Sequence, residues 1–321
     1  VFAVLWPETM IPWEFVDSEL ANRFPDVWET ELRILQNVAS TVAGEEAPPA
    51  FLLGAVYQFR RGDERHGWIG RYGAHDSCLL VDPALVPSAL EDPVPPPPPG
   101  ARPPWERGRH DKVVLVPGGE YTPLGDVLVP LRWFRSLVSV IPELDPGERG
   151  QTPFELRTSP SRHDGDTTVP FGTVICFELM FPSACRDWRG RGAEVLLNTA
   201  NDAWFGPTGF RAPIRAAAAL RAAETATSVV VAGNTGPTSA WTPTGRAYGR
   251  LRPPPPNAGE AISPDDDTFR EGWTSVPVVT DPASTPYVRM GDAPLFALLV
   301  LVFVGGLLPG PWRGGRGTMP S

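Results

Sequence analysis

One stretch of the sequence, from Thr173 to Gly206, constrains the fold more than any other. A short apolar run at Thr173–Phe177 carries Cys176 near its end, and Pro182 then opens a stretch with helical composition. A second apolar run, Glu194–Leu197, follows. Strand, helix and strand at this spacing predict a parallel βαβ unit and therefore an α/β fold.

The second apolar run ends in a polar loop, Asn198–Asp202. In open α/β sheets, chemistry gathers beyond the carboxyl ends of the strands. We therefore expect Cys176 and this loop to share one edge of a sheet. A buried cysteine is usually inert, so the prediction that Cys176 is a nucleophile depends on other residues that could activate it.

Composition narrows the classes of function. The chain is 42% hydrophobic with 11 Trp, which is enough to fill a core. Its formal net charge is −9, which argues against a nucleic-acid partner. The three cysteines, Cys78, Cys176 and Cys185, have no metal-ligand spacing and form no disulfide framework. We predict neither a metal nor a cofactor.

Proline is concentrated in two tracts among the 40 Pro of the chain. Residues 91–109 and 253–270 are predicted to be exposed insertions in a catalytic domain over residues 1–288, because proline-rich chain is extended and does not join a sheet. A docking motif for a partner domain is the alternative for the first tract. Val1–Trp6 already has the pattern of a buried strand, so we expect an N-terminally truncated domain.

The other end of the chain, residues 289–321, differs in kind. Ala293–Leu308 is an uncharged apolar run of about 16 residues, just short of the ~17–25 of a usual spanning helix. We predict a C-terminal transmembrane helix; a buried core helix is the alternative. Arg313 and Arg316 follow the run, which would place the C-terminus in the cytoplasm and the catalytic domain outside it.

Lys112 is the only lysine in the chain, and the other residues among the 28 Lys and Arg are all arginine. A position that keeps lysine is expected to need its compact, deprotonatable ammonium, unless it survives by chance at the surface. Glu120 follows in a Gly-Gly-Glu turn, where it can hold Lys112. Glu8 stands where the first strand gives way to a loop; its plain interpretation is a carboxylate in a first helical turn.

These residues lie in segments that resemble the nitrilase superfamily, and within it the apolipoprotein N-acyltransferase family. The segments follow the family's order: WPETMIP, KVVLVPGGEYTPL, VICFELMFP, LLNTANDAWFG, LRAAET, NTG and TPYVRMGD. The resemblance implies an αββα sandwich with a following membrane helix. It also implies a Glu-Lys-Cys triad of Glu8 as general base, Lys112 beside the oxyanion and Cys176 as nucleophile.

The resemblance further assigns supporting roles. Glu120 matches a second active-site glutamate and Glu178 the glutamate after the nucleophile, with Phe177 between nucleophile and glutamate; Asn201, Trp204 and Phe205 fall in the expected substrate-binding or lid segment.

The implied activity is transfer of an acyl chain from a phospholipid, through a cysteine thioester, to the N-terminal diacylglyceryl-cysteine of an apolipoprotein. The implied location is the bacterial inner membrane, with the catalytic domain on the periplasmic side. Two alternatives stay open: an amidase that hydrolyses a C–N bond, and an inactive membrane-anchored scaffold.

Overall fold

The structure is a computed structural model of the chain. It describes residues 3–7, 15–16, 18–23, 25–41, 49–60, 72–87, 94–124, 144–157, 168–205, 211–249, 274–281 and 283–307.

Within these residues the strands form two sheets. The first has the order β1-β3-β4-β5, with β2 also paired to β3. Its strands are β1 (Ala3–Trp6), β2 (Phe15–Val16), β3 (Ala50–Arg60), β4 (Tyr72–Val81) and β5 (Glu106–Asp111). The second has the order β11-β10-β9-β8-β7-β6. Its strands are β6 (Phe154–Arg157), β7 (Thr168–Ile175), β8 (Val195–Ala200), β9 (Ser228–Gly233), β10 (Ser239–Trp241) and β11 (Ala247–Tyr248).

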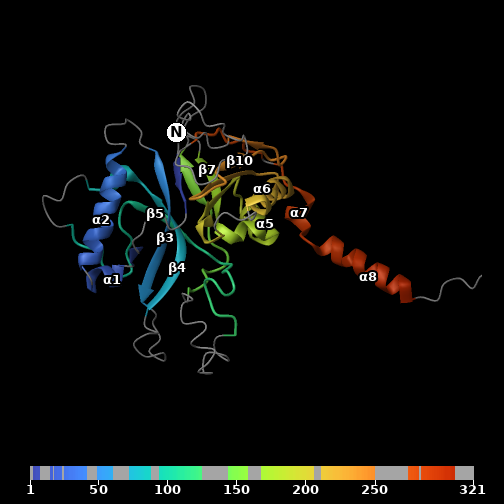
Figure 1. The fold of residues 1–321 in the computed structure, drawn as a ribbon, viewed down its shortest axis with the longest axis horizontal. Coiled ribbons are helices and arrows are strands. Elements are labelled where there is room, and N and C mark those ends of the chain that lie inside the picture. The colour runs from blue at the N-terminus through green and yellow to red at the C-terminus, as the bar shows by residue number, and fades with distance from the viewer. Residues whose placement is uncertain are drawn as a thin grey trace, which may run out of the picture.

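Helices cover the outer face of each sheet (Figure 1). On one side lie α1 (Ser18–Arg23) and α2 (Pro25–Ser40), and on the other α5 (Pro182–Gly190) and α6 (Arg211–Thr225). Short 3₁₀ turns occur at η2 (Pro83–Leu85), η3 (Cys176–Met180) and η4 (Asp202–Phe205). The expected αββα layering is confirmed.

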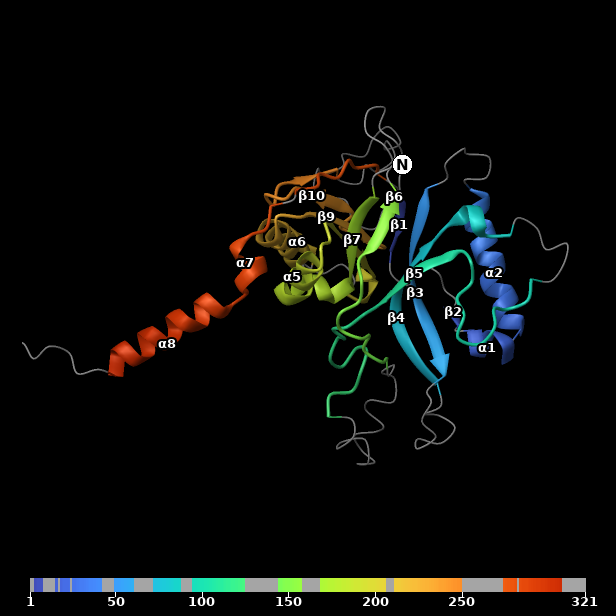
Figure 2. The ribbon, with the colours of Figure 1, turned by 180° about the vertical axis from the view of Figure 1, so that it is seen from behind.

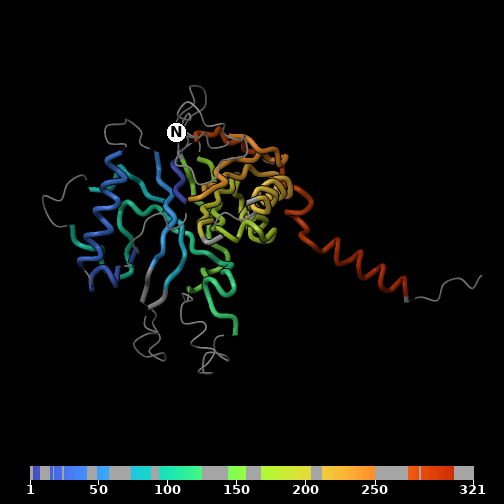
Figure 3. The backbone as a smooth tube through the Cα atoms, viewed as in Figure 1, coloured from blue at the N-terminus to red at the C-terminus, as the bar shows by residue number. Residues whose placement is uncertain are grey.

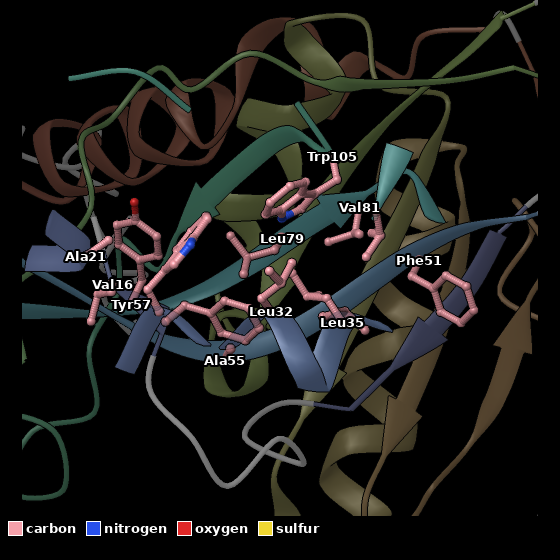
Figure 4. Packing of buried hydrophobic residues seen from close by; sticks show 14 of the residues in the cluster. Val16, Ala21, Leu32, Leu35, Phe51, Ala55, Tyr57, Leu79, Val81 and Trp105 are labelled. Carbon is pink, nitrogen blue, oxygen red and sulfur yellow. The ribbon is translucent and has the colours of Figure 1, made fainter. Parts of the chain in front are cut away.

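The core beneath α1 and α2 explains why that layer forms. Helix α2 buries Leu32 and Leu35 on the face turned to β3 and β4, and Figure 4 shows them packed near Leu79 and Ala55. Trp105 is buried in the same cluster. Each fully buried apolar side chain contributes about 1.5–3 kcal/mol, so a helix with one apolar stripe is stable only on such a face.

A second cluster fills the space between the sheets. Leu52 and Leu80 of the first sheet pack with Phe171 and Leu197 of the second, and half-buried Cys176 lies against the same cluster. Gly172 of β7 permits the close approach of α5, because a Cβ there would lie 2.5 Å from Trp188 Cγ. This layer places the ends of β5 and β7 near each other.

The predicted βαβ unit is confirmed, because β7 and β8 are parallel neighbours joined through α5. Figure 3 follows the backbone from blue at the N-terminus to red at the C-terminus. Pro182 stands at the start of α5, where its missing N–H costs nothing. The predicted polar loop begins later than expected, however. Strand β8 runs to Ala200, so Asn198 belongs to the strand and only Asn201 and Asp202 lie beyond it.

Two further expectations need correction. The first proline-rich insertion was bounded at 91–109, but Glu106–Asp111 form β5, an inner-layer strand, so the extended segment ends earlier. The proline-rich segment also contacts helix α2, because Trp28 Nε1 donates to the Val94 carbonyl at 2.8 Å. The second tract, 253–270, lies outside the described residues.

Helix α8 (Ala293–Leu307) extends away from the body after the short helix α7 (Pro286–Met290), as both views show (Figures 1 and 2). Its apolar side chains are exposed, from 48% at Val304 to 68% at Leu301 and Phe303. The alternative of a buried core helix is therefore wrong for the described part. At 15 residues the helix is about 22 Å long, against a ~30 Å hydrocarbon layer. Among the described helices, none has the length and apolarity that crossing a membrane requires.

Candidate active site

Lys112 follows directly after β5 and is completely buried, with 0% of its surface exposed. Its Nζ lies 2.5 Å from Glu120 Oε1 and 3.2 Å from Asp76 Oδ2. A buried ammonium is tolerated only when it is paired and hydrogen-bonded. The structure thus brings together Lys112 and Glu120, and it adds a second carboxylate from β4.

A tight turn holds Glu120 in place. The Gly118 N–H donates to the Tyr121 carbonyl at 2.9 Å, and Gly118 has a φ of +75°, which glycine adopts without steric cost. The second carboxylate oxygen of Glu120 accepts the Val116 N–H at 2.9 Å. Both oxygens of Glu120 are therefore engaged, one by the turn and one by Lys112.

Cys176 stands where β7 passes into the turn η3. Its φ is +51°, in the left-handed region that residues other than glycine seldom adopt. Its carbonyl accepts a hydrogen bond from Asn198 Nδ2 at 3.2 Å, and the same amide nitrogen donates to the Val174 carbonyl at 2.8 Å. Asn198, completely buried in β8, thus fixes the backbone on both sides of Ile175.

The other two cysteines have different surroundings. Cys78 and Cys185 are each 0% exposed, whereas Cys176 is half-buried. Burial raises the pKa of the Cys185 thiol to about 12 and also raises the pKa of Cys78. Because the thiolate is the reactive form, these two thiols are inert at neutral pH. Of the three, Cys176 alone combines access with a position at a strand end.

Glu178 joins the cysteine segment to the lysine segment. One of its oxygens accepts the N–H groups of Val113 at 2.7 Å and Val114 at 2.9 Å, directly after Lys112. The other accepts the Ile175 N–H at 2.8 Å, directly before Cys176. Burial raises the pKa of Glu178, against the opposing effects of these N–H donors and of Lys112. This one buried carboxylate therefore sets how the ends of β5 and β7 lie relative to each other.

The remaining predicted residues divide into two groups. Phe177 is half-buried with its ring edge-on to Phe181, their centroids 5.3 Å apart. Asn201 lies beyond β8, where its Oδ1 accepts from Asn234 Nδ2 at 2.5 Å. Glu8 and the side chains of Trp204 and Phe205 lie outside the described part of the chain, so the general base and the lid segment stay predictions.

Sequence reasoning missed Asp76 altogether. The signal was present: an aspartate stands two residues ahead of the apolar run Cys78–Val81, in the segment HDSCLLV. A carboxylate in such a place needs a buried cation, and Lys112 is the only lysine of the chain. No three His, Cys, Asp or Glu side chains among the described residues gather as a metal ion would require.

A cavity of about 1030 Å³ lies along the neighbouring edges of β5 and β6. Its walls include Arg109, Asp111, Gln151 and Phe154. None of the predicted site residues lines it, so the candidate site is defined by Lys112, Cys176 and their partners rather than by this cavity.

Comparison with known proteins identifies the family of the central part of the chain. Residues 99–253 match the carbon-nitrogen hydrolase family, and the chain therefore carries a carbon-nitrogen hydrolase domain. The matched range contains Lys112, Glu120, Cys176 and Glu178.

More particularly, the chain is a homologue of curated apolipoprotein N-acyltransferases. It is 32% identical to that of Bordetella bronchiseptica over 219 residues, 66% of this chain and 34% of the relative. It is 31% identical to that of Rhizobium meliloti over 237 residues, 73% of this chain and 34% of the relative. The chain thus spans about a third of the length of these relatives.

Among solved structures, the chain is similar to an amidase from Nesterenkonia sp. AN1, with 15% identity and a TM-score of 0.46. The similarity covers 92% of this chain and 82% of the amidase.

Proposed function

We propose that this chain is the catalytic part of an apolipoprotein N-acyltransferase in which Cys176 carries the acyl group as a thioester. The donor is a phospholipid, and the acceptor is the α-amine of an N-terminal diacylglyceryl-cysteine on a lipoprotein. The observation that carries the proposal is the bridge made by Glu178, which hydrogen-bonds directly before Cys176 and directly after Lys112.

In the first step the Cys176 thiolate attacks the ester carbonyl of the phospholipid. Glu8 takes the thiol proton, and the negative charge that develops on the carbonyl oxygen is stabilised by the Lys112 ammonium and a backbone N–H after Cys176. The C–S bond forms, the ester C–O bond breaks, and the lysophospholipid leaves with the proton that Glu8 returns. Two carboxylates pair with the Lys112 ammonium and hold it in place, which suits this electrostatic role.

In the second step the α-amine of the acceptor attacks the thioester carbonyl. The C–N bond forms, the C–S bond breaks, and the amine proton passes to Glu8. The thiolate of Cys176 is regenerated, and no oxidant, metal or cofactor is consumed. The amide product is more stable than the thioester, which drives the transfer forward.

Both substrates lie in a lipid bilayer, and α8 supplies the means to reach them. Its exposed side chains from Leu295 to Val304 carry no charge, which is the character of a segment that enters lipid. We infer that α8 inserts into the inner membrane and holds the catalytic domain at the periplasmic surface.

The test is acyl transfer from phosphatidylethanolamine vesicles labelled in the acyl chain to a synthetic diacylglyceryl-cysteine peptide. The wild-type chain should produce labelled N-acyl peptide, C176S should produce none, and C185A should match the wild type. Cys185 is a suitable control because it is buried in the helical layer and plays no part in the proposed chemistry.

The assay separates the alternatives. Release of labelled free fatty acid without acylation of the peptide would favour a hydrolase, in which water is the acceptor. Absence of both products with wild-type protein in vesicles would favour the inactive scaffold and overturn the proposal.

A further inference from the structure

Asp76 contacts Lys112 at two points. The Lys112 N–H donates to the Asp76 carbonyl at 2.8 Å, and the Lys112 Nζ lies 3.2 Å from Asp76 Oδ2. Both side chains are buried, with 0% of the lysine and 3% of the aspartate exposed. The same residue therefore fixes both ends of the lysine, its backbone and its ammonium.

The position of Asp76 makes it a rigid support. It lies within β4, which pairs with β3 on one side and β5 on the other, opposite Val56 of β3. Glu120, the other carboxylate on Lys112, comes instead from a turn after β5. A lysine side chain has four rotatable bonds, so one anchor would leave its ammonium free to pivot; anchors from two directions fix it.

A contribution to folding stability alone does not account for the buried Asp76–Lys112 pair. Buried ion pairs are often neutral or unfavourable for stability compared with apolar residues of the same size. Here the pair is retained although Cys78 and Leu80, the next residues on the same face of β4, belong to an apolar cluster, and it uses the one lysine of the chain. Two carboxylates, one from β4 and one from the turn after β5, thus pair with this ammonium, and its charge also lowers the pKa of the nearby Glu178.

We propose that Asp76 is a positioning residue, which holds the Lys112 ammonium where the chemistry of Cys176 needs it. The inference deepens the proposed function and rests on it for the identity of the reaction. Displacing a reacting or stabilising group by about 1 Å can lower a rate by about 10²-fold, so a small shift of Lys112 is enough to matter.

The test compares two substitutions that both remove the negative charge. In Asp76→Asn the side-chain oxygen still accepts a hydrogen bond from Lys112, while in Asp76→Ala it is absent. The first readout is the rate at which iodoacetamide alkylates Cys176, measured by peptide mass spectrometry. It needs no lipid substrate, and Cys78 and Cys185 are buried internal controls. The second readout is thioester formation on Cys176 with labelled phospholipid.

We expect Asp76→Ala to react about tenfold or more slowly than Asp76→Asn in both assays, and Asp76→Asn to stay within about threefold of wild type. Ser77→Ala is the matched control, because Ser77 is the buried neighbour in β4 and bonds Asp111 instead, at 2.7 Å. It should lower the melting temperature without changing either rate.

Equal rates for Asp76→Ala and Asp76→Asn, with both folded by melting temperature, would overturn the inference. If Asp76→Ala does not fold, a wild-type rate in a folded Asp76→Leu variant would overturn it as well. A third outcome separates the two proposals. If alkylation of Cys176 depends on Asp76 as expected but wild-type protein never forms a thioester, the proposed function is overturned and the positioning role stands.

Discussion

The substitution Glu178→Gln probes the bridge between the two halves of the site. A glutamine in the same pose offers one oxygen, which can keep accepting from Val113 and Val114. Its amide nitrogen then faces the Ile175 N–H, so that hydrogen bond is lost and two donors meet in a buried place. The lost bond and the buried unsatisfied donor cost about 1–3 kcal/mol, and the two remaining bonds lose their charge assistance. We expect a total loss of about 3 kcal/mol.

The measurement is urea unfolding at neutral pH, together with the rate of thioester formation on Cys176. Because Glu178 sets the position of Cys176 relative to Lys112, the rate should fall by about tenfold or more. Glu155→Gln is the matched control, since Glu155 is exposed on β6 and should change stability by less than about 0.5 kcal/mol. A Glu178→Gln protein with the stability and rate of that control would refute this account of the bridge.

Three further predictions follow from the same geometry. Burial, with a smaller effect of Glu106, raises the pKa of Glu31 from 4.5 to about 8, opposed by the Val16 N–H. As pH rises, the unfolded chain therefore loses the Glu31 carboxyl proton before the folded chain does, and the free energy of unfolding should fall between pH 4.5 and pH 8. Glu31→Gln should be more stable than wild type by roughly 3 kcal/mol at pH 7, and equally stable near pH 4. Urea unfolding at the two pH values measures both differences. Lys112→Arg should lower the rate of thioester formation by about 10²-fold, because a larger planar guanidinium does not fit between Asp76 and Glu120; an unchanged rate would contradict this reading. Iodoacetamide should label Cys176 in the native protein and reach Cys78 and Cys185 only after unfolding, as peptide mass spectrometry would detect.

The parts of the fold that followed from sequence are those with clear local signals. Pro182 and the glycines at the end of α5, Gly190 and Gly192, delimit a helix between two apolar runs, and the parallel pairing of β7 with β8 follows from that pattern. The ends of strands were harder to predict. Asn198 looks like the start of a loop, yet it is a completely buried strand residue because its amide hydrogen-bonds the neighbouring backbone.

Edge positions were the other difficulty. Phe154–Arg157 lie in a polar stretch whose composition is typical of a loop, but they form the edge strand β6. The reverse holds for Val276–Val279, whose composition of three valines is typical of a strand. These residues form no strand in the structure, although the Ser228 hydroxyl donates to the Val279 carbonyl at 2.7 Å. A short apolar run does not show whether an adjacent strand has backbone N–H and C=O groups available for pairing.

At the site, sequence reasoning located the residues that share a local segment. Lys112 and Glu120 are close in the chain, and their contact follows from the turn between them. The role of Glu178 as a bridge and the contact of Asp76 with Lys112 depend on how two sheets and two strands pack, so neither follows from spacing. A charged residue inside a buried strand was the one available clue to Asp76.

The central claim is that Cys176 accepts an acyl chain from phospholipid with the help of Lys112, and the most direct measurement leaves the acceptor out. Wild-type protein is incubated with labelled phospholipid vesicles, and the Cys176 peptide is analysed by mass spectrometry before and after hydroxylamine. We predict a labelled acyl adduct on Cys176 that hydroxylamine removes and that Lys112→Ala does not form. No adduct on wild-type Cys176, or an equal adduct on Lys112→Ala, would contradict the account.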